Sequence, residues 1–416
     1  MGEVKWTATR IDIANYCRMK YWLNYVEHAP GLRLPAFPKG SLLHEVIQHF
    51  WTRLGSEEDL RDVKMNKKGD IIKRYVYRGN KVKYHSPESF ATYAMGKWAQ
   101  VIIQDNILKK EIKDGKYTGA ELEKKNERLI AWSDHENPWV IKYGIRDISK
   151  LLFDILVEEG PPLYSELKFD FVLRDLYFED NPKNVFDLWF SGRIDEVRLR
   201  DGKVVIRDYK SGKPWIDDMK IKYDPQLTFY NAGLCSLLKK DERLAYELGV
   251  EDRREEYMGN PIFIDTNFVE EFFMVEAPLV AKRMIEKDPK VDLNRLPKIF
   301  HPTMRSDAHF FELMRMIKGT EESMVGGIIY AERGRKCDAC NFKSSCENKL
   351  EDAIKKAPEQ SNGQGLFDFA AATYEKKFIV GDGRDPITGM HVREVDTRTD
   401  SKKLQRRFNF NRLTSY

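Results

Sequence analysis

Residues 190–210 decide the fold and read FSGRIDEVRLRDGKVVIRDYK. Two segments of alternating apolar and polar side chains flank Asp201-Gly202, a dipeptide typical of the two-residue loop of a β-hairpin. If these two residues form the loop, the register places Asp195 directly opposite Asp208. The sequence therefore predicts an antiparallel hairpin that brings two carboxylates together.

Alternation gives this hairpin two faces of different character. The front face carries apolar side chains and ends in two acids and a lysine: Asp195, Val197, Leu199, Val204, Ile206, Asp208 and Lys210. The rear face is expected to be solvated apart from Val205, since it carries Glu196, Arg198, Arg200, Lys203 and Arg207. Opposed like charges are destabilising, and half-buried carboxylates are costly unless something neutralises them. A divalent cation with oxygen ligands would do so. The alternative is an edge hairpin with solvated acids.

The composition fits a sizeable globular protein. The chain has 416 residues, of which 42% are hydrophobic and 33% charged, with a net charge of +4. This length predicts two to three domains or one elaborated domain. The mild positive charge is compatible with nucleic acid but does not argue for it. No apolar run is long enough to cross a bilayer, and the amino end lacks the apolar stretch of a secretory signal. A soluble, cytoplasmic protein is expected.

Sequence patterns divide the chain into five segments. A helix is expected across residues 11–25 with Cys17 inside it, and another is expected to begin at Ser41. Helices broken at Pro138 should fill residues 87–158, strands residues 164–210, and a helix should begin at Asp224-Pro225. A further helix is expected from Ser306 to about Tyr330. The predicted segments are an N-terminal part (1–55), a mainly helical insertion (56–160), a core (161–300), a cysteine segment (301–355) and a polar, basic tail (356–416).

Further candidate site residues surround the two acids. Glu166 lies in an alternating strand that could lie beside the hairpin, and Lys210 shares the face of Asp208. Gln226 and Tyr230 are four residues apart, which places both on one side of a helix. His44 follows Gly40-Ser41 in the expected second helix. Taken singly, His44 fits a structural histidine, and Gln226 and Tyr230 fit an ordinary helix surface. Their significance lies in their combination.

The cysteines form a second pattern. Cys337, Cys340 and Cys346 cluster near the carboxyl end, and Cys17 lies near the amino end. Such spacing resembles metal ligation more than a secreted disulfide framework. Four thiolates could bind zinc or an iron–sulfur cluster, and spacing alone does not decide between them. Cys235 reads as a buried small hydrophobe.

Taken together, GSLLHEVIQHF, GRID, DYKSGK and QLTFY resemble the RecB-type branch of the PD-(D/E)XK nuclease superfamily. The resemblance covers about residues 5–60 and 160–240. It implies an α/β, restriction-endonuclease-like fold, in which helices flank a mixed β-sheet, and hydrolysis of DNA phosphodiesters. By this resemblance Mg²⁺ or Mn²⁺ is bound by Asp195, Asp208, the carbonyl of Tyr209, and His44. The remaining roles it implies are a second ion or a metal water for Glu166, water orientation or charge stabilisation for Lys210, and DNA-backbone contacts for Gln226 and Tyr230.

The segment TRIDIANYCRMKYWLNYV resembles the amino-terminal part of AddB-type and CRISPR-associated RecB-like nucleases. In those families one early and three late cysteines hold a 4Fe–4S cluster. The resemblance therefore implies a cluster on Cys17, Cys337, Cys340 and Cys346, which would act as an iron–sulfur staple between the N- and C-terminal segments.

These features predict a metal-dependent DNA nuclease, an exonuclease acting on single-stranded or end-bearing DNA. DNA repair or recombination, phage DNA metabolism (in the host cytoplasm) and CRISPR adaptation would each fit. No GxxxxGK[ST] sequence is present, so a helicase or recombination partner would be a separate protein. The alternatives are a non-catalytic DNA-binding or scaffold subunit of a helicase–nuclease or replication complex, and a nuclease stapled by zinc.

Two features of the tail each allow two interpretations. The segment from Gln364 to Phe369 loosely resembles peptides that dock on DNA sliding clamps, although its spacing is imperfect and packing of the tail onto the core is the favoured explanation. A terminal cluster could contact nucleic acid or be a solvated end; it contains Lys402, Lys403, Arg406, Arg407, Phe408, Phe410 and Arg412.

Overall fold

The structure is a computed structural model and describes residues 4–29, 31–53, 76–77, 80–133, 136–178, 181–212, 214–259, 264–326, 329, 337 and 340–355. The chain divides into two compact units. The first takes in residues 1–32, 170–191 and 307–416, and the second takes in residues 33–169 and 192–306. The predicted clamp peptide and the terminal basic cluster lie outside the described residues.

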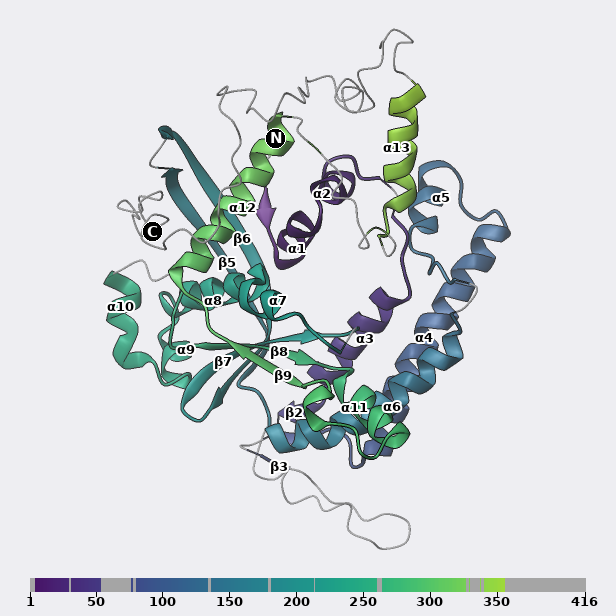
Figure 1. The fold of residues 1–416 in the computed structure, drawn as a ribbon, viewed down its shortest axis with the longest axis horizontal. Coiled ribbons are helices and arrows are strands. Elements are labelled where there is room, and N and C mark those ends of the chain that lie inside the picture. Colours follow the sequence, from purple (N-terminus) through teal and green to yellow (C-terminus); the bar gives the residue numbers. More distant parts are fainter. Residues whose placement is uncertain are drawn as a thin grey trace, which may run out of the picture. The chain divides into compact units, whose positions relative to one another are not determined.

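The larger unit contains most of the secondary structure (Figure 1). Its helices are α3 (Ala36–Gln48), α4 (Pro87–Lys113), α5 (Gly119–Asn126), α6 (Pro138–Glu159), α7 (Asp218–Tyr223), α8 (Pro225–Leu238), α9 (Glu242–Glu247), α10 (Arg254–Gly259) and α11 (Ala277–Lys287), with short 3-10 turns η2 (Glu251–Arg253) and η3 (Leu293–Arg295). Its strands are β2 (Trp51–Arg53), β3 (Val76–Tyr77), β4 (Asn80–Val82), β7 (Lys203–Lys210), β8 (Val269–Met274) and β9 (Phe300–Thr303). Two long strands, β5 (Tyr164–Phe178) and β6 (Asn181–Arg200), run through both units.

A mixed sheet forms the centre of this unit. Strand β7 pairs antiparallel with β6 and parallel with β8, while β8 pairs antiparallel with β9 and β5 pairs with β6. Strand β7 is therefore an interior strand, and its residues 204–209 are all buried. A near-continuous buried run is typical of a strand covered on both faces, so the hairpin is not at an edge.

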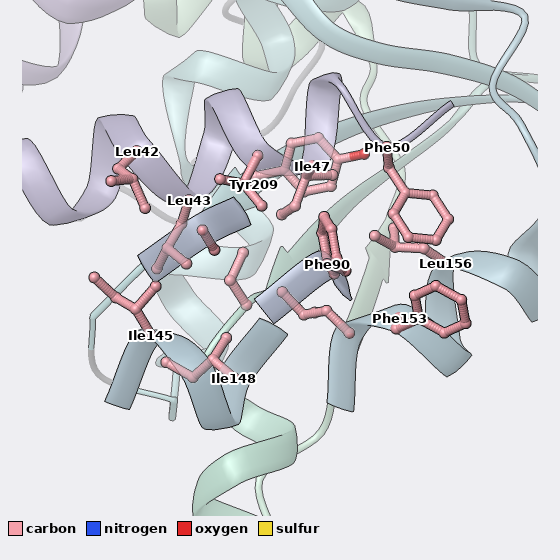
Figure 2. Close-up of a cluster of buried hydrophobic side chains, with 14 of the residues drawn as sticks. Leu42, Leu43, Ile47, Phe50, Phe90, Ile145, Ile148, Phe153, Leu156 and Tyr209 are labelled. Carbon is pink, nitrogen blue, oxygen red and sulfur yellow. The ribbon is translucent and has the colours of Figure 1, made fainter. Parts of the chain in front are cut away.

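Helices cover both faces of β7. On the rear face, Tyr209 and Phe273 belong to a hydrophobic cluster built largely from α3, α4 and α6. Figure 2 shows Leu43 of α3, Phe90 of α4 and Phe153 of α6 converging in this cluster. Helices α4 and α6 pack along each other (Figure 1), and α8 contacts β7 and β8. Helices around a mixed sheet confirm the predicted α/β class.

The smaller unit contains β1 (Lys5–Trp6), α1 (Ala8–Tyr16), α2 (Arg18–Tyr25), α12 (Asp307–Gly326) and α13 (Lys343–Lys355). Strand β1 pairs in parallel with β6 through Trp189 and Phe190. Helix α1 contacts α12, and α2 contacts α13, so the two ends of the described chain come together in this unit.

Most predicted elements occur, with two corrections. The single helix expected at residues 11–25 is wrong, because Cys17 is extended (φ −170°, ψ 123°) and separates α1 from α2. The start of the next helix at Ser41 is also wrong, because α3 begins at Ala36 and ends at Gln48. Pro138 begins α6 and Asp224-Pro225 begins α8, as predicted. Among the described residues, no helix has the length and apolar character needed to span a membrane.

Candidate active site

The predicted hairpin forms in the predicted register. Asp201 and Gly202 both have positive φ, 52° and 73°, as a type I′ turn requires. The ladder runs from Arg200 opposite Lys203 to Glu196 opposite Arg207. One further step in this register places Asp195 opposite Asp208.

The expectation of a solvated rear face is wrong. Glu196, Arg198 and Arg207 are only 2%, 4% and 0% exposed. They lie in a buried ion-pair network that also includes Glu159, the last residue of α6, and Glu271 of β8. The polar pattern looked solvated because its partners come from elements far away in the sequence.

Of the two acids on the front face, Asp208 is buried and Asp195 is partly buried, and their close ionisable partners are Lys210 and His44. Asp208 is 1% exposed, and the side chain of Asp195 is 12% exposed. Asp195 Oδ2 accepts a hydrogen bond of 3.0 Å from the backbone N–H of Tyr209. Burial, and then repulsion from Asp208, raises the pKa of Asp195 well above its usual range. Burial also raises the pKa of Asp208, although Lys210 opposes the shift. These are not the solvated acids of an edge hairpin.

Lys210, Gln226 and Tyr230 form a chain of contacts around Asp208. Lys210 Nζ lies 2.9 Å from Asp208 Oδ2 and donates to Gln226 Oε1 at 2.6 Å. The Gln226 amide donates to Asp208 Oδ1 at 2.7 Å and to the Tyr230 hydroxyl at 2.8 Å. Gln226 is therefore the central member of this chain, and the i,i+4 pair faces the acids rather than solvent.

His44 of α3 reaches the same place. Its Nδ1 lies 3.4 Å from Asp195 Oδ2. Burial lowers the pKa of His44, while Asp208 and a backbone hydrogen bond with Tyr209 oppose the shift. A side chain at Gly40 would approach Ser211 Oγ to 2.6 Å, so glycine lets α3 lie close to the end of β7.

Glu166 approaches the acids from β5 in an unusual backbone conformation. Its φ of 54° is costly for a residue with a side chain, and such outliers concentrate at functional sites. Its carboxylate contacts Arg193 at 2.9 Å and contributes to the raised pKa of Asp195. Strand β5 thus lies beside the hairpin as predicted, and Arg193 is a neighbour that the sequence did not single out.

Two glycines bring α8 close to the strand that carries Asp195. A Cβ on Gly192 would lie 2.6 Å from the Phe169 ring, and one on Gly233 would lie 2.7 Å from the same ring. Phe169 also packs edge-to-face on Phe229 of α8. Because there is no side chain at either glycine, α8 can approach β6 and Gln226 can reach Asp208.

The types of ligand around the two acids suit a magnesium or manganese ion, but the side chains are not already arranged as a metal-binding group. Within the described part of the chain, no three His, Cys, Asp or Glu side chains form a ready metal-binding group. Asp208 Oδ2 is buried and receives no well-oriented hydrogen bond, although the Lys210 ammonium is close. Two carboxylates, an imidazole and a backbone carbonyl form a mainly oxygen donor set. Mg²⁺ is commonly held by one or two carboxylates, with waters and substrate phosphates completing its shell.

The predicted cluster cysteines lie in one neighbourhood of the smaller unit. Cys17 belongs to a small hydrophobic cluster with Leu23 and Phe342, and Cys340 and Cys346 pack against it. The pKa of Tyr16 is raised by burial and then by Cys340, Cys337 and Cys17, so these thiols lie close to one tyrosine. The four residues are of the right type for a thiolate-bound group and lie in one unit, but within the described part of the chain they do not form a ready metal-binding group. Cys235 is fully buried, as expected of a small hydrophobe.

Comparison with known proteins agrees with this geometry. Among curated proteins, none matches the chain. The family described as the PD-(D/E)XK nuclease superfamily matches it over residues 5–347, which include both the acidic site and all four cysteines of the predicted cluster. The chain therefore belongs to the PD-(D/E)XK nuclease superfamily, whose members are generally metal-dependent nucleases.

Proposed function

We propose that this chain is a Mg²⁺- or Mn²⁺-dependent deoxyribonuclease of the RecB type. The observation that carries the proposal is the pair formed by buried Asp208 and partly buried Asp195, with the Lys210 ammonium 2.9 Å from Asp208. Two acids without compensating arginines form a stable arrangement when a cation lies between them. Family membership supports nuclease activity in general, and this pair supports the position of the reacting centre.

Each neighbouring residue has a distinct task in this proposal. When bound, the cation supplies positive charge that lowers the pKa of a water and polarises a phosphoryl oxygen. Asp195, Asp208, His44 and the Tyr209 carbonyl would hold it, and Glu166 would hold a second ion or a water. Lys210 orients the attacking water or stabilises the negative charge that develops on the phosphate. Gln226 keeps Lys210 in place through its 2.6 Å contact and faces the DNA backbone, whereas Tyr230, only 3% exposed, acts through its hydrogen bond with Gln226 and not by the predicted DNA contact.

The proposed substrate is single-stranded or end-bearing DNA, degraded exonucleolytically in repair, recombination, phage DNA metabolism or CRISPR adaptation. End-labelled single- and double-stranded DNA should be incubated with Mg²⁺ or Mn²⁺, and product lengths followed with time. A steadily shortening ladder indicates exonucleolytic action, whereas discrete internal fragments would contradict it.

The matched variants are Asp208→Asn and Asp252→Asn. The first removes a buried charge at the site, and the second changes an exposed aspartate of η2 in the same unit. Because the ion's contribution is worth several kcal/mol, Asp208→Asn should lower the rate by roughly a thousandfold. Asp252→Asn should cleave like the unaltered protein. DNA binding without cleavage by the unaltered protein would favour the non-catalytic scaffold.

We also propose that Cys17, Cys337, Cys340 and Cys346 hold a 4Fe–4S cluster. The proposal is supported by their shared surroundings in the smaller unit and by the resemblance of the amino-terminal segment. Anaerobically purified protein should be brown and contain iron, and Cys340→Ala should lose colour, iron and stability together. Cys235→Ala is the control, because that thiol lies in the other unit. A colourless protein that contains zinc would show the zinc-stapled alternative instead.

A further inference from the structure

The connection between Lys210 and Gln226 exposes large apolar side chains. Trp215, Met219 and Tyr223 are 55%, 65% and 52% exposed. A single exposed apolar residue needs no explanation, but three within nine residues are a local concentration. Trp215 precedes α7, and Met219 and Tyr223 belong to it. We call these three residues the α7 platform.

The α7 platform lies in the chain between two residues of the proposed reacting centre, Lys210 and Gln226. Trp215 is five residues beyond Lys210, so their Cα atoms are at most about 18 Å apart. Tyr223 is three residues before Gln226, which limits that separation to about 11 Å. Gln226 itself contacts Asp208 at 2.7 Å. Short stretches of chain therefore join both ends of the α7 platform to residues that contact Asp208.

A buried arginine holds the platform in place. Arg305 is 1% exposed and donates 2.9 Å hydrogen bonds to the carbonyls of Ile221 and Lys222 at the end of α7. It also donates to the carbonyl of Asp224 at 3.3 Å. The Asp224 carboxylate in turn accepts from the backbone N–H of Gln226 at 2.9 Å. The platform and the Gln226 contact are thus fixed to the same buried group.

Charge around the platform is balanced. Lys220 and Lys222 are exposed, and Lys222 Nζ lies 5.2 Å from the Tyr223 ring centre. Exposed Asp217 and Asp218 at the start of α7 offset these lysines. A balanced surface gains little from phosphate attraction alone, so binding here must depend mainly on the faces of the rings.

We propose that the α7 platform binds unpaired bases of a DNA strand by stacking, and so selects single-stranded DNA at the site. This inference rests on the proposed function and names its substrate class. Base–aromatic stacking tolerates any sequence, because every base has a π face. Bases inside a duplex already stack on their neighbours, so a duplex offers no free face to Trp215 or Tyr223.

Binding in EDTA tests the platform separately from cleavage. Full-length protein should be titrated into labelled oligothymidylate, an abasic oligonucleotide of equal length and a blunt duplex, with fluorescence anisotropy as the readout. Trp215→Ala should raise Kd for oligothymidylate about 5- to 150-fold, because stacking contributes about 1–3 kcal/mol per base. Kd for the abasic strand should be unchanged. Trp215→Phe should keep most of the affinity, and Tyr246→Ala, which alters an exposed aromatic on α9, should keep all of it.

The outcomes separate the two proposals. If Trp215→Ala binds oligothymidylate normally, or loses affinity equally for the abasic strand, the stacking inference is wrong even when the unaltered protein cleaves DNA. If the variant instead dissociates a dimer seen by light scattering, a second copy of the chain covers the platform and the inference is also wrong. Failure of the nuclease proposal would appear as cleavage unaffected by Asp208→Asn, which the EDTA titration does not involve.

Discussion

Replacing Arg207 with Met tests whether the rear face of the hairpin is the buried ion-pair network seen in the structure. Arg207 is fully buried, and its guanidinium lies 2.6 Å from Glu159 and 2.5 Å from Glu271. Removing the cation leaves Glu271, itself fully buried, with partly exposed Arg200, and it leaves Glu159 and Glu196 to share Arg198. Breaking a buried pair on one side costs about 3–5 kcal/mol. The free energy of unfolding should therefore fall by about that amount.

Arg200→Met provides the matched control on the same face. Arg200 contacts the same Glu271 at 2.7 Å, but a third of its side chain is exposed. Ion pairs at such positions are worth up to about 1 kcal/mol, because water screens them. Both proteins should be unfolded in urea at neutral pH, with far-UV circular dichroism as the readout. The two substitutions differ little in chemistry, so a difference between them reports burial and the number of partners lost.

Lowering the pH should reduce the difference in free energy of unfolding between the Arg207→Met protein and the unaltered protein. Burial alone would raise the pKa of Glu196, but Arg207 and Arg198 outweigh it and hold the pKa below its ordinary value. A lowered pKa gives stability that is present above the unfolded value and lost as pH falls through the folded one. The variant has less of this stability to lose. The network would be refuted if Arg207→Met and Arg200→Met had equal free energies of unfolding at neutral pH. It would also be refuted if the difference between Arg207→Met and the unaltered protein grew in acid.

Three further predictions concern packing and pH. Gly192→Ala should destabilise the protein by about 1–3 kcal/mol in urea, because the new Cβ would lie 2.6 Å from the Phe169 ring. Arg305→Met should destabilise it by about 1–3 kcal/mol and weaken oligothymidylate binding, because buried carbonyls of α7 lose their donors. Burial raises the pKa of Glu270 from 4.5 to about 7, so its contribution to stability is full below pH 4.5 and is lost as pH rises through 7. In the Glu270→Gln protein, the loss of unfolding free energy between pH 4.5 and above pH 7 should be smaller by roughly 3 kcal/mol, measured as the pH dependence of the urea midpoint.

Each of these predictions has a result that contradicts it. A Gly192→Ala protein as stable as the original would mean that α8 does not approach β6 as closely as described. Unchanged DNA affinity in Arg305→Met would separate α7 from the binding surface. Parallel pH profiles for Glu270→Gln and the unaltered protein would show that Glu270 titrates normally despite its burial.

The geometry of the front face of the hairpin was predictable because it is determined by residues that are close together in the sequence. Asp201-Gly202 fixes the loop, the loop fixes the register, and the register fixes which acids oppose each other. Asp224-Pro225 similarly marks the start of α8, and i,i+4 spacing then places Gln226 and Tyr230 together. In each case a residue pair close in sequence carries the geometry.

The rear face and the helix spacing were not predictable in this way. Whether Arg207 is solvated depends on Glu159 and Glu271, which lie 48 and 64 residues away in the chain. Likewise, Gly192 shows its importance only once Phe169 packs against it. The break at Cys17 gave no glycine or proline signal, so a single helix was the natural expectation there.

Asp195 and Glu196 are adjacent in the chain and buried in the same strand, yet their pKa values move in opposite directions. Burial penalises the charge of each, so burial does not explain the difference. Two arginines contact Glu196, whereas the neighbours of Asp195 are Asp208, the backbone N–H of Tyr209 and His44. The fold thus pairs Glu196 with two arginines behind the sheet, whereas in front it leaves two acids together with Lys210 beside Asp208, at a cost that a stable core would avoid. That cost is understandable if the front acids serve a ligand that carries positive charge, which is why the contrast between these two neighbours supports a metal-dependent site.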